Sequence, residues 1–258
     1  MKIVVLMKQV ANKDAVLRIR SDERWIDESD VSQQTNESDG YALEEALRTK
    51  EAKGEGEVIV CTLGKQSAKS VIKDALARGA DRAIHVLVED ENSLSPFQIA
   101  EAIGSAIKEE NPDLIFTGLQ SDDASYGQTG VVLAELLDIP HATIVIEVDR
   151  ESINGSVRVK RELESGWYQW FNYKMPSLLT IQSGISQIRY ASLKGIMAAK
   201  RKEIREVEAA IGDVDSGQVI EKVYMPLKTK ETQILGGGDA KAGALELVEK
   251  LRNEARVL

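Results

Sequence analysis

Cysteine and histidine are scarce in this chain. Cys61, His85 and His141 are the only residues of these two types among 258. A single cysteine cannot form an internal disulfide, and the sequence has no Cys/His cluster of the kind that holds zinc or an iron–sulfur centre. We expect Cys61, inside the apolar run Val58–Cys61, to be a small core side chain. Each histidine sits in or beside a predicted strand and is expected to be a hydrogen-bonded core residue.

An excess of positive charge is also missing. The chain has 33 basic and 42 acidic residues, which gives a net charge of −9. A surface that binds nucleic acid needs excess Lys and Arg to displace counterions, so nucleic acid is not expected as a partner. No apolar stretch reaches the ~18 residues of a membrane-spanning helix, and no signal-peptide pattern opens the sequence. These absences predict a cytoplasmic protein without membrane insertion.

Common nucleotide-binding and catalytic motifs are absent as well. No G-x-G-x-x-G follows the first predicted strand, and no G-x-x-x-x-G-K-S/T occurs anywhere. Met7-Lys8-Gln9 stands where a pyrophosphatase loop of the S-G-G-x-D-S type would lie. No serine or cysteine occupies a nucleophile elbow. The adjacent acids Glu44 and Glu45 face different directions on a predicted helix, so we expect both to be solvated. The sequence shows no bond-breaking machinery.

Strands and helices alternate over the first part of the chain. Most of the strand-like runs are continuous Val/Ile/Leu sequences, typical of parallel strands buried on both faces. The predicted strands are Ile3–Met7, Val58–Thr62, Ala83–Val88, Leu114–Thr117 and Thr143–Val148. The predicted helices are Tyr41–Lys53, Ser67–Arg78, a helix that Ser95 caps with Pro96 in its first turn, and Gln128–Leu137. This alternation predicts a doubly wound α/β fold with a mostly parallel, Rossmann-like sheet.

The pattern changes in the second half. Ser156–Glu162 and Trp167–Tyr173 alternate between apolar and polar residues, which predicts an antiparallel hairpin. The cluster Trp167-Tyr168-Gln169-Trp170-Phe171 either buries against the sheet or enlarges an interface. A further apolar strand follows at Ser177–Ile181.

Beyond Glu203 the apolar content thins, and Gly236-Gly237-Gly238 interrupts the chain before an amphipathic helix at Ala242–Arg256. We therefore expect an α/β domain over 1–202 and an extended C-terminal arm over 203–258. The arm either packs on another subunit or folds back on its own domain.

Gly118–Gly130 is the best candidate for a ligand site. The segment follows a predicted strand and leads into the helix at Gln128, so it lies at the carboxyl end of a parallel strand. Its glycines allow the backbone to approach a ligand closely, and the first turn of the helix presents N–H groups that can hold a phosphate. Asp122 and Asp123 would repel a phosphate, so we assign them to ribose hydroxyls, an amine or bonds that brace the loop. The alternative is a polar loop with ordinary capping.

A large aromatic and three large apolar side chains gather near Gly195. They are Tyr190, Leu193, Ile196 and Met197, and Arg189 precedes them. Such a segment is either a core helix or a surface peptide that anchors a partner, and its spacing alone favours the core.

Four blocks of the sequence resemble the electron transfer flavoprotein beta subunit. R-Y-A-S-L-K-G-I-M-A-A-K at Arg189–Lys200, followed by Glu203-Ile204, is similar to the family's signature. The other blocks are KIVVLMKQV (Lys2–Val10), ALARGADRAIHV (Ala75–Val86) and GLQSDDASYGQTG (Gly118–Gly130). The blocks keep the family's order and spacing and cover roughly four fifths of the chain, which is much more specific than one short motif.

The resemblance implies a heterodimer in which the alpha subunit holds most of the FAD and this chain binds AMP in a cleft of its own. In electron-bifurcating members a second FAD occupies that cleft, and the sequence leaves both possibilities open. Carried over by position, the cleft residues of the loop are Gly118, Gln120, Ser121, Asp122, Asp123, Gly127, Gln128, Thr129 and Gly130. Leu6, Asn36, Asp39, Leu63 and Gly64 would line the same cleft, the two leucines through backbone atoms.

The resemblance also implies how partners are engaged. Arg189, Tyr190, Leu193, Ile196 and Met197 would form a docking segment for acyl-CoA dehydrogenase-type flavoenzymes, with Leu193 as the anchor. Electrons would leave to a quinone reductase or another acceptor, and the arm over 203–258 would reach onto the alpha subunit. Such a carrier needs no catalytic residues, because the cofactor carries the redox chemistry. A stand-alone adenine-nucleotide-binding sensor of the same fold is the alternative.

Overall fold

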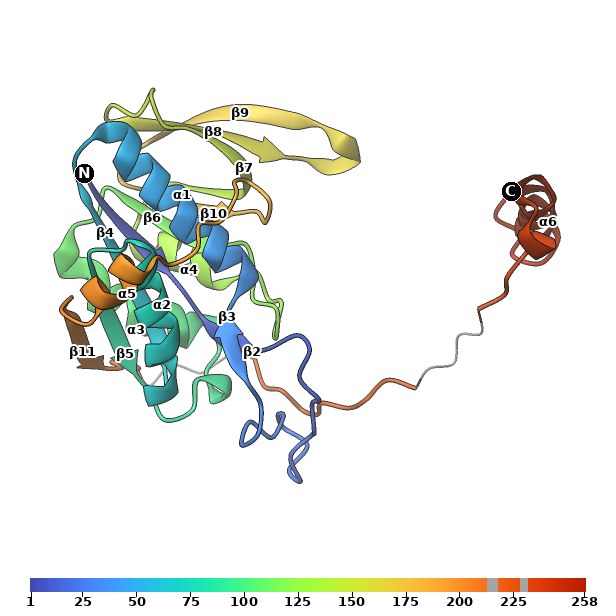
Figure 1. Ribbon diagram of the computed structural model, residues 1–258, viewed down its shortest axis with the longest axis horizontal. Coiled ribbons are helices and arrows are strands. Elements are labelled where there is room, and N and C mark those ends of the chain that lie inside the picture. Colours follow the sequence, from blue (N-terminus) through green and yellow to red (C-terminus); the bar gives the residue numbers. More distant parts are fainter. Residues whose placement is uncertain (213–217, 228–231) are drawn as a thin grey trace. The chain divides into compact units, whose positions relative to one another are not determined.

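The computed structural model describes residues 1–212, 218–227 and 232–258. The chain forms two compact units, Met1–Val223 and Tyr224–Leu258. The first unit holds every strand that the described residues form (Figure 1). The second contains α6 (Ala240–Asn253), preceded by a short turn at Gly236–Gly238.

A nine-stranded sheet with the order β11-β5-β4-β1-β6-β10-β7-β8-β9 forms the centre of the first unit. Its first seven strands in that order run parallel, and β8 and β9 extend it as an antiparallel hairpin. The strands are β1 (Lys2–Leu6), β4 (Glu57–Gly64), β5 (Arg82–Leu87), β6 (Leu114–Gly118), β7 (His141–Asp149), β8 (Ser156–Glu162), β9 (Tyr168–Lys174), β10 (Ser177–Ile181) and β11 (Ile204–Glu208). The predicted doubly wound, mostly parallel sheet with its hairpin is confirmed.

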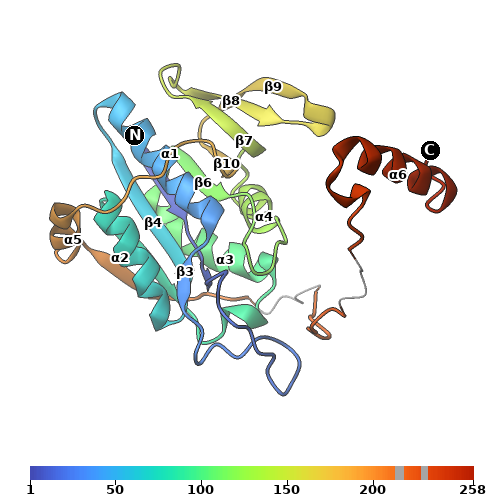
Figure 2. The same cartoon turned by 45° about the vertical axis from the view of Figure 1, so that its right-hand side comes forward.

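Helices cover both faces of the sheet (Figure 2). Along β1, Ile3 and Val5 pack with residues of α1 (Glu37–Lys53) and α2 (Lys69–Arg78), whereas Val4 and Leu6 pack with residues of α3 (Pro96–Ile107) and α4 (Thr129–Leu136). Successive side chains of a strand point to opposite faces. The continuous apolar run of β1 therefore serves two separate cores. A fifth helix, α5 (Leu193–Ala199), packs against α2.

Three features of the fold depart from the predicted elements. Helix α1 begins at Glu37 rather than Tyr41, with Asn36 before its first turn. Two short polar strands, β2 (Gln9–Ala11) and β3 (Gln33–Thr35), form a separate antiparallel pair. Strand β11 pairs with β5 at the edge of the sheet, so part of the segment expected as an arm over 203–258 belongs to the sheet. Residues 213–217 and 228–231 of that arm lie outside the described residues.

The prediction that Glu44 and Glu45 are solvated is wrong. Both side chains are buried on α1, at 3% and 0% exposure. Each carboxylate has a cationic partner: Glu44 pairs with Arg189 and Arg48, and Glu45 accepts two hydrogen bonds of 2.7 Å from Arg150. Burial of a charge is costly unless it is paired, and these partners come largely from distant parts of the chain. They join α1 to the segments around residues 150 and 189.

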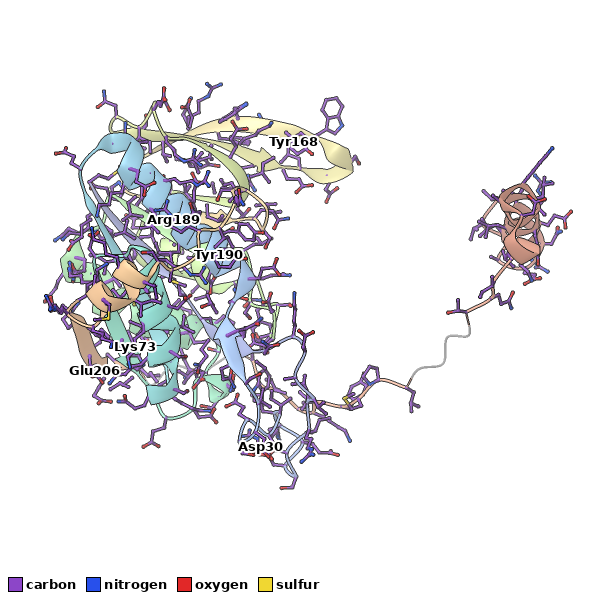
Figure 3. All side chains as sticks on the ribbon, viewed as in Figure 1. Asp30, Lys73, Tyr168, Arg189, Tyr190 and Glu206 are labelled. Atoms are coloured by element: carbon purple, nitrogen blue, oxygen red, sulfur yellow. The ribbon has the colours of Figure 1, made fainter. Side chains whose placement is uncertain are left out.

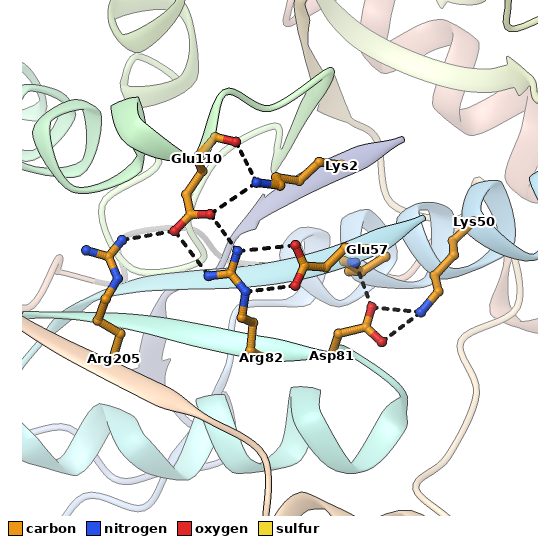
Figure 4. A network of polar contacts seen from close by, with 8 residues as sticks. Lys2, Lys50, Glu57, Asp81, Arg82, Glu110 and Arg205 are labelled. Carbon is orange, nitrogen blue, oxygen red and sulfur yellow. Dashed lines mark hydrogen bonds and ion pairs between the residues drawn. The ribbon is translucent and has the colours of Figure 1, made fainter. Parts of the chain in front are cut away.

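A charged network joins the amino ends of several strands (Figure 4). Arg82, at the start of β5, donates to Glu57 at 2.8 Å and to Glu110 at 2.5 Å. Glu110 also accepts from Arg205 at 3.1 Å and pairs with Lys2. The Arg82 hydrogen bonds, opposed by partial burial and reinforced by the charge of Lys2, lower the pKa of Glu110 to about 2. One carboxylate thus ties β1, β5 and β11 to the end of α3.

Replacing Glu110 with glutamine should lower the free energy of unfolding at pH 7 by about 2 kcal/mol, because Arg82, Arg205 and Lys2 lose the negative charge and one of the two oxygens that they bind. In the wild type the stabilisation by the Glu110 charge is complete above the ordinary glutamate pKa of 4.5 and is lost as the pH falls toward 2. Urea denaturation between pH 7 and pH 2 measures both effects, with the exposed neighbour Glu109→Gln as the control. A stability difference that does not shrink in acid would contradict the role of the carboxylate.

Candidate functional site

A cavity of about 440 Å³ lies at the carboxyl ends of β1, β4 and β6. Leu6, Leu63, Thr117 and Gly118 are among its lining residues. β1 and β6 are neighbours at the point where the strand order reverses, because the chain runs from β1 to β4 and β5 on one side and from β6 to β10 on the other, before β11 returns to pair with β5. Ligands of doubly wound folds bind at such a switch point. The volume is within the range of small-molecule sites.

A buried carboxylate closes the floor of this cavity. Asp39, in the first turn of α1, accepts from Lys8 N at 2.7 Å and from Gly118 N at 3.0 Å. These two amides follow β1 and end β6, so one side chain joins the two strand ends. Burial raises the pKa of Asp39 to about 7, against the opposing effect of the Lys8 and Gly118 amides and the Asn36 side chain. The charge of this group therefore changes near neutral pH.

The start of α1 also fixes the loop that follows β6. Asn36 donates from Nδ2 to Gln120 O at 3.0 Å and accepts from Asp122 N at 2.9 Å. Ser38 Oγ donates to the same Gln120 carbonyl at 2.8 Å. Asn36 and Ser38 are almost completely buried. Their polar groups are satisfied by the loop backbone, which holds the wall of the cavity in one conformation.

Asp122 and Asp123 brace the same loop from outside the cavity. Asp122 accepts from Glu37 N at 3.1 Å, and Asp123 pairs with Lys8 Nζ at 2.7 Å. Of the three roles considered for these acids, the structure displays the backbone bonds that brace the loop, and Asp123 accepts one from Ala124 N at 2.7 Å. Their carboxylates are thereby directed to protein donors.

Helix α4 begins at the wall of the cavity. Gln128, Thr129 and Gly130 line it, and the first hydrogen bond within the helix runs from Val132 N to Gln128 O at 2.9 Å. The amides that precede Val132 belong to the first turn, where a helix N-terminus favours an anion. The wall is suited to a phosphate group.

The glycines of the loop have different tasks. Gly127 has φ +62°, a conformation that side chains disfavour. At Gly130 a Cβ would lie 2.9 Å from Thr117 Oγ1 and 3.1 Å from Thr180 Cγ2, so this glycine lets α4 approach β6 and β10. A Cβ at Gly118 would collide with Ser38 Oγ and Asp39 Oδ1 and lie 2.8 Å from Asp39 N. Gly118 and Gly130 make close packing between elements possible.

Most of the residues assigned to the cleft from the sequence lie together around the cavity. Gly64, Asp122 and Asp123 do not line it, whereas the others do: Leu6, Asn36, Asp39, Leu63, Gly118, Gln120, Ser121, Gly127, Gln128, Thr129 and Gly130. Cys61 lines the cavity as a fully buried side chain, in agreement with its predicted place in the core. His85 is buried and hydrogen-bonds to Gly64 O, as predicted, whereas His141 is exposed.

Three stretches of the cavity wall were not foreseen from the sequence. One loop precedes β3 and contributes Arg20, Asp22, Arg24 and Trp25; the second runs from Asp90 to the start of α3 at Pro96. The third is Gln218, Val219 and Ile220, in the segment expected as an arm. In the second loop, the only feature recognised from the sequence was the helix start at Ser95-Pro96. The structure has a capping box there, formed by Ser95 and Gln98. The first loop carries no recognised motif, and its place at the cavity follows from tertiary contacts such as Arg24 NH1 to Ile220 O.

The segment predicted to be either core or surface lies at the surface. Tyr190 is 95% exposed and Leu193 is 84% exposed, and Ile196 and Met197 are exposed too. Arg189 differs from these four residues, because its guanidinium pairs with Glu44 and Glu51 on α1. Leu193, Ile196 and Met197 lie within about one turn of one another on α5, and Tyr190 precedes the helix; we call these four exposed side chains the apolar patch.

Three aromatic residues of the hairpin cluster are also exposed, whereas Phe171 is half-buried beside Tyr173. Trp167, Tyr168 and Trp170 lie on or beside β9, the edge strand. Arg158 stacks 4.6 Å from the centroid of the Trp170 ring, and Lys160 lies 5.1 Å from that of Tyr168.

Residues 24–211 match the protein-family model described as the electron transfer flavoprotein domain. The chain belongs to this family. Among curated proteins, it is 35% identical to an electron transfer flavoprotein subunit beta of Methylophilus methylotrophus over 245 residues, covering 92% of this chain and 93% of the relative. A mitochondrial subunit beta of Oryza sativa subsp. indica is 36% identical over 262 residues, and one of Bacillus subtilis (strain 168) is 33% identical over 265, both with full coverage of the two chains.

Membership of the electron transfer flavoprotein family confirms the resemblance inferred from the four sequence blocks. The similarity extends over the loop after β6, the α5 segment and the chain beyond β11. No helix within residues 1–212, 218–227 and 232–258 is long and apolar enough to cross a membrane. The same stretches contain no group of His, Cys, Asp and Glu side chains able to hold a metal ion.

Substituting Gly118 with alanine should lower the free energy of unfolding by about 2–3 kcal/mol, since the new Cβ forces α1 away from the end of β6. Gly104→Ala is the matched control: its Cβ meets only Leu133 Cδ1, at 3.2 Å, within a helix where alanine is favoured. Urea denaturation compares the two variants. Equal stabilities would mean that the close approach at Gly118 is unimportant.

Proposed function

We propose that this chain is the beta subunit of a heterodimeric electron transfer flavoprotein that carries electrons between flavoenzymes. The observation that carries the proposal is similarity to proteins named as this subunit over the whole chain. Full-length similarity supports a subunit over a stand-alone sensor, because it includes the part beyond β11 that a sensor would not need. The second unit, Tyr224–Leu258, is the part of the predicted arm that is proposed to pack on the alpha subunit.

The cavity is proposed to bind an adenine nucleotide. Its position at the switch point of the sheet and the start of α4 at its wall support a phosphate-bearing ligand. Apolar side chains such as Leu6, Leu63 and Ile103 line the same cavity and suit a flat base. AMP is the ligand proposed here, and a second FAD is the alternative for a bifurcating protein.

The alpha subunit is proposed to hold most of the FAD, which supplies the electron-transfer chemistry when bound. This chain would then act as an electron carrier without substrate turnover of its own. Its residues fix the nucleotide-binding cleft through Asp39 and Asn36 and keep the loop after β6 in place. The proposed compartment is the cytoplasm, although the rice relative is named mitochondrial.

The exposed patch Tyr190, Leu193, Ile196 and Met197 is proposed to dock acyl-CoA dehydrogenase-type flavoenzymes. An isolated apolar patch at a surface is suited to a pocket of a partner, and one protruding leucine can supply much of the binding energy. A quinone reductase is the proposed acceptor.

Purified heterodimer, made by co-expression with the alpha subunit, should release AMP in addition to FAD on denaturation. Ala124→Tyr, which places a bulky ring in the cavity, should lower the AMP content several-fold and leave the FAD content unchanged. Ala15→Tyr, at a half-buried position that does not line the cavity, is the control. Chromatography of the released nucleotides gives the stoichiometry.

The same measurement separates the alternatives. One FAD and one AMP per heterodimer agree with the proposal, and two FAD per heterodimer indicate a bifurcating protein. One FAD without AMP, or an AMP content that Ala124→Tyr does not change, removes the adenine nucleotide from this cavity.

Leu193→Ala should raise the KM of a purified acyl-CoA dehydrogenase for the flavoprotein by about thirtyfold, which corresponds to an anchor worth ~2 kcal/mol. Because Leu193 is mostly exposed, its truncation leaves little cavity, and Tm and flavin content should stay at wild-type values. Leu136→Ala, at another exposed leucine, is the control. An unchanged KM would refute the docking role of Leu193.

A further inference from the structure

One guanidinium is held at the base of the exposed patch. Arg189 N and Nε donate to Glu44 Oε2 at 3.0 and 2.9 Å. The terminal nitrogens of Arg189 donate to Glu51 at 2.5 and 3.0 Å, and one of them also reaches Glu44 at 3.1 Å. Arginine has five N–H donors in a rigid fork, so these bonds occupy most of them. Figure 3 labels Arg189 and the adjacent Tyr190 beside α1.

The two acids differ in their surroundings. The Glu44 side chain is 3% exposed and that of Glu51 is 58% exposed. Burial raises the pKa of Glu44, but the hydrogen bonds from Arg189 and Arg48 outweigh it, so the pKa lies below its ordinary value and the group is charged. Arg48 also donates to Gln187 O at 2.9 Å. The backbone is therefore fixed at residues 187 and 189.

The other end of the patch is fixed to α2. Ser192 Oγ accepts from Gly195 N at 3.0 Å and caps α5. A Cβ at Gly195 would collide with Ala77 O, so α5 lies directly against the end of α2. Beyond α5, Lys202 Nζ donates to Leu76 O at 2.9 Å. The apolar patch thus lies between two anchored ends, one on α1 and one on α2.

We propose that Arg189 is a positioning residue for partner docking and makes no contact with the partner itself. Arg189, Glu44 and Glu51 form an arginine clamp that holds Tyr190 to Met197 in the conformation that presents Leu193. Preorganisation of a binding segment reduces the entropy lost on association. The proposal rests on the docking function proposed above and changes the role of Arg189, which the sequence had grouped with the docking residues.

The competing possibility is that Arg189 binds an acid of the partner. It would then have to leave the two carboxylates that hold it, or share its occupied donors. The two possibilities predict different effects of removing the Glu51 charge. If the clamp positions the segment, removal weakens docking. If Arg189 contacts the partner, removal frees the guanidinium for that contact and does not weaken docking.

Hydrogen exchange of the heterodimer tests the clamp without any partner. Arg189→Lys replaces the planar fork with a single ammonium that cannot bind two carboxylates bidentately. Glu51→Gln keeps the size of an exposed side chain and removes its charge. Both variants should speed amide exchange over Tyr190 to Met197 by about tenfold, the factor expected for loss of one charge-assisted hydrogen bond. Glu206→Gln, which removes the surface pair with Lys69, is the matched control.

Electron transfer from a purified acyl-CoA dehydrogenase gives the second readout. Arg189→Lys and Glu51→Gln should each raise the KM for the flavoprotein by about tenfold with kcat and flavin content unchanged. In the Leu193→Ala background the effect of Arg189→Lys should largely disappear, because the clamp acts through Leu193.

The outcomes separate this proposal from the docking function. Exchange that stays at the wild-type rate in both variants overturns the clamp. An increase in KM for Arg189→Lys together with an unchanged or lower KM for Glu51→Gln also overturns it and indicates direct contact. An unchanged KM for Leu193→Ala refutes docking by this patch, and the exchange rates still decide whether the clamp exists.

Discussion

The carboxylate of Asp39 is the contact on which the site depends. It receives the amide after β1 and the amide that ends β6, and it comes from the first turn of α1. Three elements that are distant in sequence meet at this side chain, which also lines the cavity. Gly118 is part of the same constraint, because only a residue without a Cβ lets Asp39 reach the end of the strand.

The two ends of the parallel sheet are stabilised in different ways. At the amino ends, charged side chains such as Arg82 and Glu110 hold the strand starts together. At the carboxyl ends, backbone amides and carbonyls are satisfied by short polar side chains such as Asn36 and Ser38. Short side chains leave room for a ligand, whereas long charged pairs fill the space between strands.

The main sheet could be predicted because its strands are continuous apolar runs, as in β1 and β4, or clear alternations, as in β8. Strand β11 could not, since its sequence Ile204-Arg-Glu-Val-Glu is mostly charged and is extended only by pairing with β5. The first turn of α1 was missed for a similar reason: Ser38 and Asp39 are polar in sequence, and they are buried where they contact Lys8 after β1, the end of β6 and the loop that follows it. Local pattern cannot reveal such distant partners.

Within the candidate site, the loop after β6 could be predicted from its glycines and from its position after a strand. The tasks of individual glycines were not, because close approach to a ligand and close approach to another element have the same sequence signature, as Gly118 and Gly130 demonstrate. Arg20 and Trp25 reach the cavity from a loop without a motif. Arg189 belongs to the segment that resembles the family signature. Its partners Glu44 and Glu51 lie far away in sequence, so their ion pairs could not be predicted.

The hairpin at the edge of the sheet has a consequence for solubility. Strand β9 is an edge strand with exposed Trp167, Tyr168 and Trp170, and such edges can pair with strands of other molecules and aggregate. The neighbouring strand places Arg158 and Lys160 over the aromatic rings. Loss of Arg158 or Lys160 would leave the rings of Trp170 or Tyr168 uncovered beside an edge that can pair with a strand of another molecule.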